Sequence, residues 1–301
     1  MTDATISTTL SSGGETFPAP GIKRSYWRMV GRRLRHDYVT LFFLALILLL
    51  VLAAVFAPLI APFDPNKTSM LYRLKPIGYK DFLLGTDELG RDMLSRLIYG
   101  GRMSLMMGLA PVALATSIGG LLGVMAGFAG GWVNTLIMRT MDVFYAFPSV
   151  LLAVAISGTM GGGVANGLVA LTLVFIPPLC RVSEAATTQI RSRDFVEAAR
   201  ASGASSLSIV FYHVLRNVLA PIFIYASSLI SVSILLAAGL SFLGLGVEPP
   251  TADWGLMLST LRQSIYVQPA ICALPGVAIF IASLSFNLVS DGLRQAMDIR
   301  T

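Results

Sequence analysis

The sequence predicts an all-α membrane protein that crosses the bilayer six times and keeps both termini in the cytoplasm. Of its 301 residues, 55% are hydrophobic and only 13% are charged, and the mean hydropathy is +0.74. A soluble domain of this length would need far more charge on its surface. Long uncharged stretches alternate with short polar ones. We expect spans near residues 40–60, 104–128, 136–157, 167–185, 219–242 and 270–289.

The orientation follows from the positive charges. Residues 1–22 are rich in Ser, Thr, Gly and Pro, which predicts a disordered tail without the apolar core of a signal peptide. Between Lys23 and His36 there are six Lys or Arg residues, which predicts a basic interfacial helix on the anionic inner leaflet. We therefore expect residues 1–38 to form a cytoplasmic tail that contacts membrane lipids, and residues 39–301 to form a transmembrane domain.

The segments between the spans add detail. Residues 64–102 form a polar excursion on the outer side, and its second half predicts a turn followed by an amphipathic helix. Small residues at Gly119, Gly123 and Gly127 predict a face on which another helix packs closely. Two pairs with i,i+3 spacing, Arg139 with Asp142 and Arg181 with Glu184, are interpreted as local ion pairs at the inner ends of their spans; a contact with a transported solute is the alternative for the first pair.

Several classes of site lack support in the sequence. The positive charges lie in separate loops, so nucleic acid is not an expected partner. The two cysteines, Cys180 and Cys272, lie in apolar surroundings, and there are only two histidines, so neither a disulfide framework nor a metal site is expected. There is no GxxxxGK[ST] phosphate loop, and no cofactor is expected. The chain is therefore not expected to be an enzyme.

The most unusual stretch is a polar segment, residues 191–217, which carries four arginines. Residues 194–202 predict a short helix that stops at Gly203, and Ser205 is a suitable N-cap for a second helix. Small side chains on the first helix leave little bulk above its backbone. Two interpretations remain open: an ordinary solvated loop, or a surface that fits a groove on another protein.

A sequence pattern in this segment favours the second interpretation. Glu197, Ala198 and Ala199, followed by three residues and then Gly203, resemble the EAA signature of the inner-membrane permease subunits of ABC importers. Leu215 also matches the family pattern, whereas Arg216 stands where the family usually has proline. The resemblance implies that residues 186–217 form a coupling loop, in which these five matching residues transmit force from an ATPase.

Three longer runs resemble the C-type permease subunits of dipeptide, oligopeptide and nickel importers. They are LGTDELGRDMLSRL at 84–97 with GGRMSL at 100–105, LSFLGLGVEPPTADWG at 240–255, and FNLVSDGLR at 286–294. The resemblance implies the type I ABC importer architecture in a bacterial inner membrane. It further implies a second permease subunit, two ATP-binding subunits that hydrolyse ATP, and an extracytoplasmic solute-binding protein.

The alternatives belong to different classes. A secondary transporter or channel would work without ATPases, and ion-driven carriers usually hold an ionisable residue near the middle of a span, where this sequence has none. An intramembrane enzyme would need a motif such as HExxH or GxSxG, and neither occurs. For a permease, the small neutral path that we expect is compatible with peptides, a metal chelate, glutathione or opines.

Overall fold

The computed structural model describes residues 31–297. The expected disordered tail and most of the basic helix, including Lys23, lie outside the described residues. Regular structure in the described part consists of helices. Five of them are long and apolar enough to cross a membrane, and a bent pair accounts for a sixth crossing. The five are α2 (Tyr38–Val55), α4 (Met93–Ala129), α7 (Val164–Arg191), α10 (Leu215–Phe242), which continues the helical segment that begins at Ser206, and α12 (Pro269–Met297).

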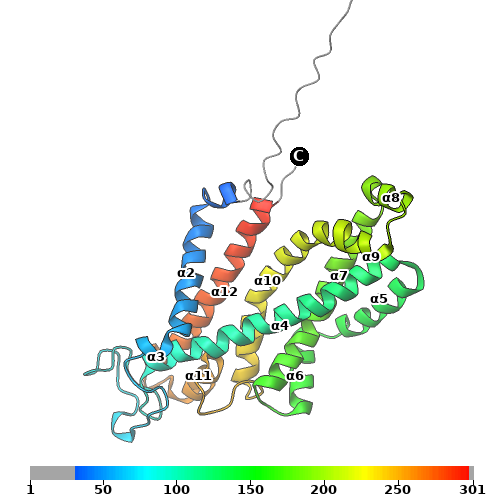
Figure 1. Ribbon diagram of the computed structural model, residues 1–301. Coiled ribbons are helices and arrows are strands. Elements are labelled where there is room, and N and C mark those ends of the chain that lie inside the picture. The colour runs from blue at the N-terminus through cyan, green and yellow to red at the C-terminus, as the bar shows by residue number, and fades with distance from the viewer. Residues whose placement is uncertain (1–30, 298–301) are drawn as a thin grey trace, which may run out of the picture.

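Shorter helices complete and join these long ones. They are α3 (Ala57–Ile60), α5 (Gly131–Tyr145), α6 (Ser149–Met160), α8 (Asp194–Ala201), α9 (Ser206–Ile209) and α11 (Trp254–Leu261). The start of α2, the end of α12 and helices α8 and α9 lie at one end of the molecule, and α3, α6 and α11 lie at the opposite end (Figure 1). Six crossings therefore return the chain to the side on which it started, as predicted.

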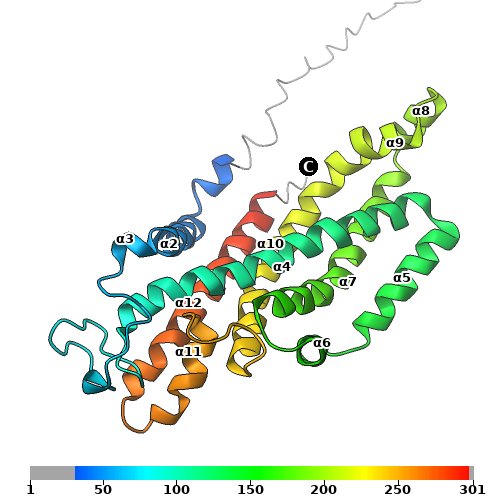
Figure 2. The same cartoon turned by 60° about the horizontal axis from the view of Figure 1, so that its bottom comes forward.

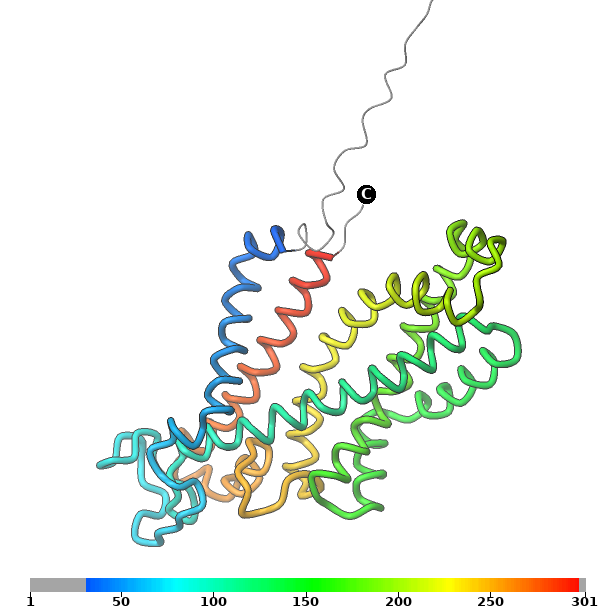
Figure 3. Tube along the Cα trace, viewed as in Figure 1, coloured from blue at the N-terminus to red at the C-terminus, as the bar shows by residue number. Residues whose placement is uncertain are grey.

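Helix α4 is the longest single element, and it begins at Met93, well before the expected start of the span at residue 104. The predicted amphipathic helix and the second span are thus one continuous helix. Its 37 residues span about 55 Å, against about 30 Å of hydrocarbon, so the helix must be strongly tilted. Figures 2 and 3 show it running obliquely across the other spans.

The glycine face of α4 packs on α7, as the spacing predicts. A Cβ atom added at Gly119 would lie 2.6 Å from the backbone oxygen of Ile176, and one added at Gly127 would lie 2.7 Å from that of Glu184. Real Cβ atoms do not approach so closely, so the two backbones meet only because these positions lack side chains. This contact fixes the relative position of the second and fourth spans.

The third span differs from the prediction of one helix over residues 136–157. It is broken into α5 and α6, which meet at an angle of 87°. Pro148 is the N-cap residue of α6, and its ring disfavours helical geometry at the preceding residue, Phe147. The pairing of charges also differs, because Arg181 contacts Asp142 on α5. Glu184, its expected partner, instead accepts a hydrogen bond from Asn134 Nδ2 at 2.7 Å.

The outer ends of the spans are joined by a buried polar contact between two distant sequence runs. Ser104 Oγ on α4 donates to Asp253 Oδ1 at 2.6 Å, and the backbone N–H of Trp254 donates to Ser104 Oγ at 3.0 Å. The indole Nε1 of Trp254 donates to the carbonyl oxygen of Leu97 at 2.9 Å. Trp254 belongs to a buried apolar cluster that also includes Met93. The start of α11 is therefore fixed to α4.

A second buried cluster shapes the outer loop before α4. Asp87 accepts hydrogen bonds from the Nε of Arg91 at 2.6 Å and from the backbone of Leu89 at 2.9 Å. Arg96 on α4 approaches the same carboxylate at 3.4 Å and donates to the carbonyl oxygen of Pro65 at 3.0 Å. Because buried charges are stable only when paired and hydrogen-bonded, this cluster holds the loop to the outer end of α4.

Candidate functional site

The polar segment forms two short helices at the end of the molecule where the chain starts and finishes. Helix α8 begins at Asp194, and Glu197 lies in the same first turn, so both acidic groups lie near the positive end of the helix dipole. Helix α9 begins at Ser206 and continues through a π-helical turn, residues 210–214, into α10. Figure 1 shows α8 projecting beyond the neighbouring span ends.

The turn between the two helices is a Schellman motif. Gly203 has a φ of +80°, and its N–H donates to the carbonyl oxygen of Arg200 at 3.0 Å. The N–H of Ala204 reaches back to the carbonyl oxygen of Ala199 at 3.1 Å. These are the two bonds that define the motif, and glycine is favoured at its left-handed position. Both the stop at Gly203 and the cap at Ser205, which accepts from the backbone of Ser208, are as predicted.

Apolar anchors hold the segment on the ends of the spans. Val196 of α8 is fully buried, as are Ile209 and Val214 on the other side of the turn. They pack in one cluster with Val124 of α4 and Val218 of α10. Burial of each such side chain contributes about 1.5–3 kcal/mol relative to exposure. The polar segment is consequently fixed to α4 and α10 rather than free to swing.

The outward face of the segment includes a patch of small groups beside Glu197. Glu197, Ala198, Ser202 and Gly203 are exposed, and no atom lies within 4 Å of the place where a Cβ of Gly203 would be. Ala199 instead faces inward and is partly buried against the apolar cluster. The resulting surface has no nucleophile beside a base, so it is suited to contact another protein rather than to bond chemistry.

Leu215 lies apart from this surface. It is partly buried at the start of α10, where it packs against the same apolar cluster and lines a cavity described below. The next residue, Arg216, is exposed, and its guanidinium lies 5.7 Å from the ring centre of Tyr212. Because arginine retains the backbone N–H that a proline would lack, the helix continues through this position. The five residues predicted to couple thus fall into an exposed group and an inward pair, Ala199 and Leu215.

Sequence reasoning missed two features of this region. Leu207 is 72% exposed and Phe211 is 60% exposed, both beside the small-residue surface. Large apolar side chains in an otherwise polar segment were the available signal, because an exposed apolar patch indicates an interaction site. The second feature is Arg200, whose guanidinium lies 5.6 Å from the ring centre of Phe128 on α4 and adds a contact between the segment and the span.

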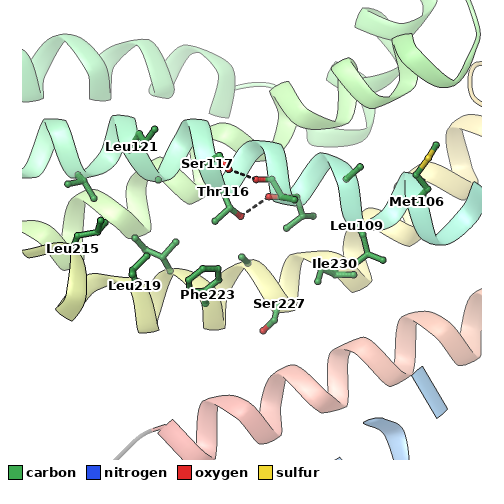
Figure 4. A pocket seen from close by; sticks show the side chains of 17 residues that line it. Met106, Leu109, Thr116, Ser117, Leu121, Leu215, Leu219, Phe223, Ser227 and Ile230 are labelled. Atoms are coloured by element: carbon green, nitrogen blue, oxygen red, sulfur yellow. Dashed lines mark hydrogen bonds between the residues drawn. The ribbon is translucent and has the colours of Figure 1, made fainter. Parts of the chain in front are cut away.

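An apolar cavity of about 840 Å³ lies between α4 and α10, and Figure 4 shows its lining. Its polar lining consists of the hydroxyls of Thr116, Ser117 and Ser227. Thr116 donates to the carbonyl oxygen of Val112 at 2.6 Å and Ser117 to that of Ala113 at 3.0 Å. These bonds stay within α4, so the cavity presents neutral and largely apolar walls. Within residues 31–297 no group of three His, Cys, Asp or Glu side chains could hold a metal ion.

Comparisons with known proteins agree with this architecture. A family model described as a binding-protein-dependent transport system inner membrane component matches residues 119–301. A second, the N-terminal transmembrane domain of oligopeptide transport permease C, matches residues 25–76. The structure of the MetNI methionine ABC transporter in inward-facing conformations has a TM-score of 0.57 and 20% sequence identity, covering 68% of this chain and 97% of that chain. At this identity the likeness shows the fold alone.

Two curated relatives extend over nearly the whole chain. The di/tripeptide transport system permease protein DppC of Pseudomonas aeruginosa is 42% identical over 287 residues, which cover 94% of this chain and 93% of the relative. The glutathione transport system permease protein GsiD of Pectobacterium atrosepticum is 38% identical over 275 residues, covering 91% of each. The chain therefore belongs to the family of binding-protein-dependent transport system inner membrane components, the bacterial inner-membrane permease subunits of ABC importers.

Proposed function

We propose that this permease subunit imports peptides and that its polar segment docks on an ATP-binding subunit. The observation that carries the docking proposal is the exposed small-residue surface around Ala198 and Gly203, which is held rigidly by buried anchors. A flexible loop would deform when a partner displaced it. A segment whose anchors are buried among three spans instead passes the displacement on to those spans.

The route of that force can be traced through contacts. Val196 and Ile209 belong to one buried apolar cluster with Val124 of α4 and Val218 of α10. Arg200 adds its contact with Phe128. A displacement of α8 therefore acts on both walls of the α4–α10 cavity. In the proposed cycle, ATP-driven closure of two ATP-binding subunits moves this segment and switches the path between inward and outward access.

The cavity walls support a peptide as the solute. In the proposed complex, α4 and α10 form half of the translocation path and a second permease subunit forms the other half, while an extracytoplasmic binding protein delivers the solute. Walls without charge and with few hydroxyls can accept side chains of different size and polarity. DppC is named as a di/tripeptide permease protein, and GsiD as a glutathione permease protein; both names refer to small peptides.

Replacement of Ala198 by phenylalanine tests the docking proposal. Because Ala198 is exposed, the change should leave folding and membrane insertion intact while obstructing the docked partner. We expect uptake of a labelled dipeptide by the complete transporter to fall at least about tenfold, the effect of losing roughly 1.4 kcal/mol of interface energy.

The matched control is Ala273→Phe, at an exposed position near the outer end of α12. It adds the same bulk far from the polar segment and should leave uptake unchanged. Equal uptake by both variants would contradict docking at Ala198. Uptake that follows a proton gradient and persists after ATP depletion would contradict the whole proposal.

A further inference from the structure

Three charged side chains meet on α5 and α7, outside the coupling segment and the cavity. The carboxylate of Asp142 contacts the guanidinium of Arg181, and its other oxygen lies 3.8 Å from Nη1 of Arg139. The guanidinium of Arg181 also lies 4.9 Å from the ring centre of Tyr145. Residues from two spans therefore build one cluster with two positive charges and one negative charge.

The cluster lies away from the inner ends of helices α5 and α7. Arg181 is about 15 Å along α7 from its last residue, Arg191. Asp142 is about 16 Å along α5 from Gly131, which is on the same inner side. The only other acidic group near it on α7, Glu184, is held by Asn134 and by Thr188 and does not neutralise the arginines.

The cluster nevertheless remains open. The side chains of Arg181 and Asp142 are 45% and 40% exposed, and that of Arg139 is 80% exposed. Charged groups within a span are costly against lipid and usually face a water-filled path or a polar partner. This surface is therefore expected to line an aqueous space in the assembled transporter.

The arginines have unused hydrogen-bonding capacity. Within the described residues Arg139 makes only the long contact with Asp142, although a guanidinium carries five N–H donors. A planar guanidinium binds a carboxylate through two parallel hydrogen bonds. The net charge of the cluster is positive, so it favours an anionic group over a cationic one.

We propose that Arg139 and Arg181 form a subsite for the carboxylate of the transported solute, in an inner part of the translocation path that is lined by α5 and α7 and lies apart from the α4–α10 cavity. Asp142 holds the Arg181 guanidinium against α5 and keeps the two positive charges close together. The exposed ring of Tyr145 offers an apolar surface beside the carboxylate. This inference rests on the proposed function, because it presumes that a peptide passes between the permease subunits.

A cysteine reporter beside the cluster tests the inference. Val143 is 63% exposed and adjoins Asp142, and the natural cysteines Cys180 and Cys272 are buried. The assay measures labelling of Val143→Cys by a water-soluble thiol reagent in inside-out vesicles. The vesicles contain both permease subunits and the ATP-binding subunits but no binding protein, so only the path can recognise the peptide.

We expect the dipeptide Ala-Ala to slow labelling, and its C-terminal amide to require at least about tenfold higher concentration for equal protection, because a charge-assisted hydrogen bond is lost. Arg139→Gln should abolish the difference between acid and amide, and Arg139→Lys should restore part of it. Since Arg139 is exposed and makes no other contact within the described residues, these variants should fold normally. Trp132 is 76% exposed at the start of α5. Trp132→Cys is therefore the control, and neither peptide should slow its labelling.

Three results would overturn the subsite: no reaction of Val143→Cys with the water-soluble reagent, equal protection by the acid and the amide, or acid-selective protection that survives in Arg139→Gln. A labelling rate that depends on anionic lipid in the vesicles and not on the peptide would also overturn it, since the cluster would then bind headgroups. ATP-coupled dipeptide uptake by the same Val143→Cys transporter is measured separately. Uptake without protection rejects the subsite alone, whereas loss of ATP coupling in the unsubstituted transporter rejects the proposed function.

Discussion

Replacing Gly203 by alanine should weaken the turn on which the proposed docking surface depends. Gly203 has a φ of +80°, a conformation that costs a residue with a Cβ about 1–2 kcal/mol. The space around it is open, so the penalty comes from the backbone and not from a clash. Buried anchors on both sides, Val196 and Ile209, prevent the segment from relaxing without exposing apolar surface.

A penalty of this size lowers the population of the correct turn, relative to distorted ones, about fivefold to thirtyfold. The assay is uptake of a labelled dipeptide and the ATP hydrolysed per dipeptide, in proteoliposomes that hold the complete transporter. We expect Gly203→Ala to raise the ATP consumed per dipeptide at least about fivefold, and Gly203→Val to have a larger effect because a β-branched residue is least tolerant of positive φ.

Asparagine at the same position separates backbone geometry from bulk. It adopts the left-handed conformation more readily than other residues with side chains, yet it is larger than alanine. Gly203→Asn should therefore couple better than Gly203→Ala. If the asparagine variant is the more defective of the two, side-chain bulk at the docked surface is decisive and the argument from φ is refuted. Equal coupling by glycine, alanine and valine would refute any role for the turn.

Three further predictions concern packing and orientation. Gly119→Ala would place a Cβ 2.6 Å from a backbone oxygen of α7 and should lower stability in detergent by about 1–3 kcal/mol. Gly158→Ala has open space around it and should not lower stability. Equal melting temperatures of the two variants would contradict the α4–α7 contact. Trp254→Phe removes the hydrogen bond to α4 and should cost about 1 kcal/mol in the same melting experiment; an unchanged melting temperature would contradict that bond. An impermeant thiol reagent outside intact cells should label Tyr266→Cys, an exposed position at the outer end, and not Ser202→Cys; the opposite pattern would reverse the orientation.

The parts of the fold that sequence reasoning predicted well depend on local physics. Uncharged length alone indicated where most of the long apolar helices lie, whereas the orientation inferred from positive charge stays a prediction. The turn at Gly203 and the cap at Ser205 were predictable because each depends on one residue and its nearest backbone groups. The spacing of small residues predicted a packing face on α4, although it could not name α7 as the partner.

The features that sequence reasoning missed either depend on contacts between residues far apart in the sequence or are hidden when hydropathy is averaged over a window. Hydropathy averaged over residues 136–157 indicates a single span, and the average hides the break at Pro148, although the proline itself was a visible signal. Arg181 was assigned to its nearest acidic neighbour on the same helix, whereas it contacts Asp142, 39 positions away. The roles of Glu197, Ala198, Ala199, Gly203 and Leu215 in coupling remain predictions with which the geometry of the polar segment is compatible.

One helix, α4, reaches from the outer end of the molecule to the polar segment. Its first turns carry the tryptophan contact at the outer face, and Val124 near its last turn packs with the anchors of the polar segment. If α4 moves as one body over its length of about 55 Å, rotation by about 5° around one end displaces the other end by about 5 Å. A displacement at the polar segment can thus reach the outer end of the molecule through α4 itself, which is also a wall of the cavity. A shorter or more flexible α4 should therefore leave both ends of the molecule folded, but movement at one end should no longer displace the other.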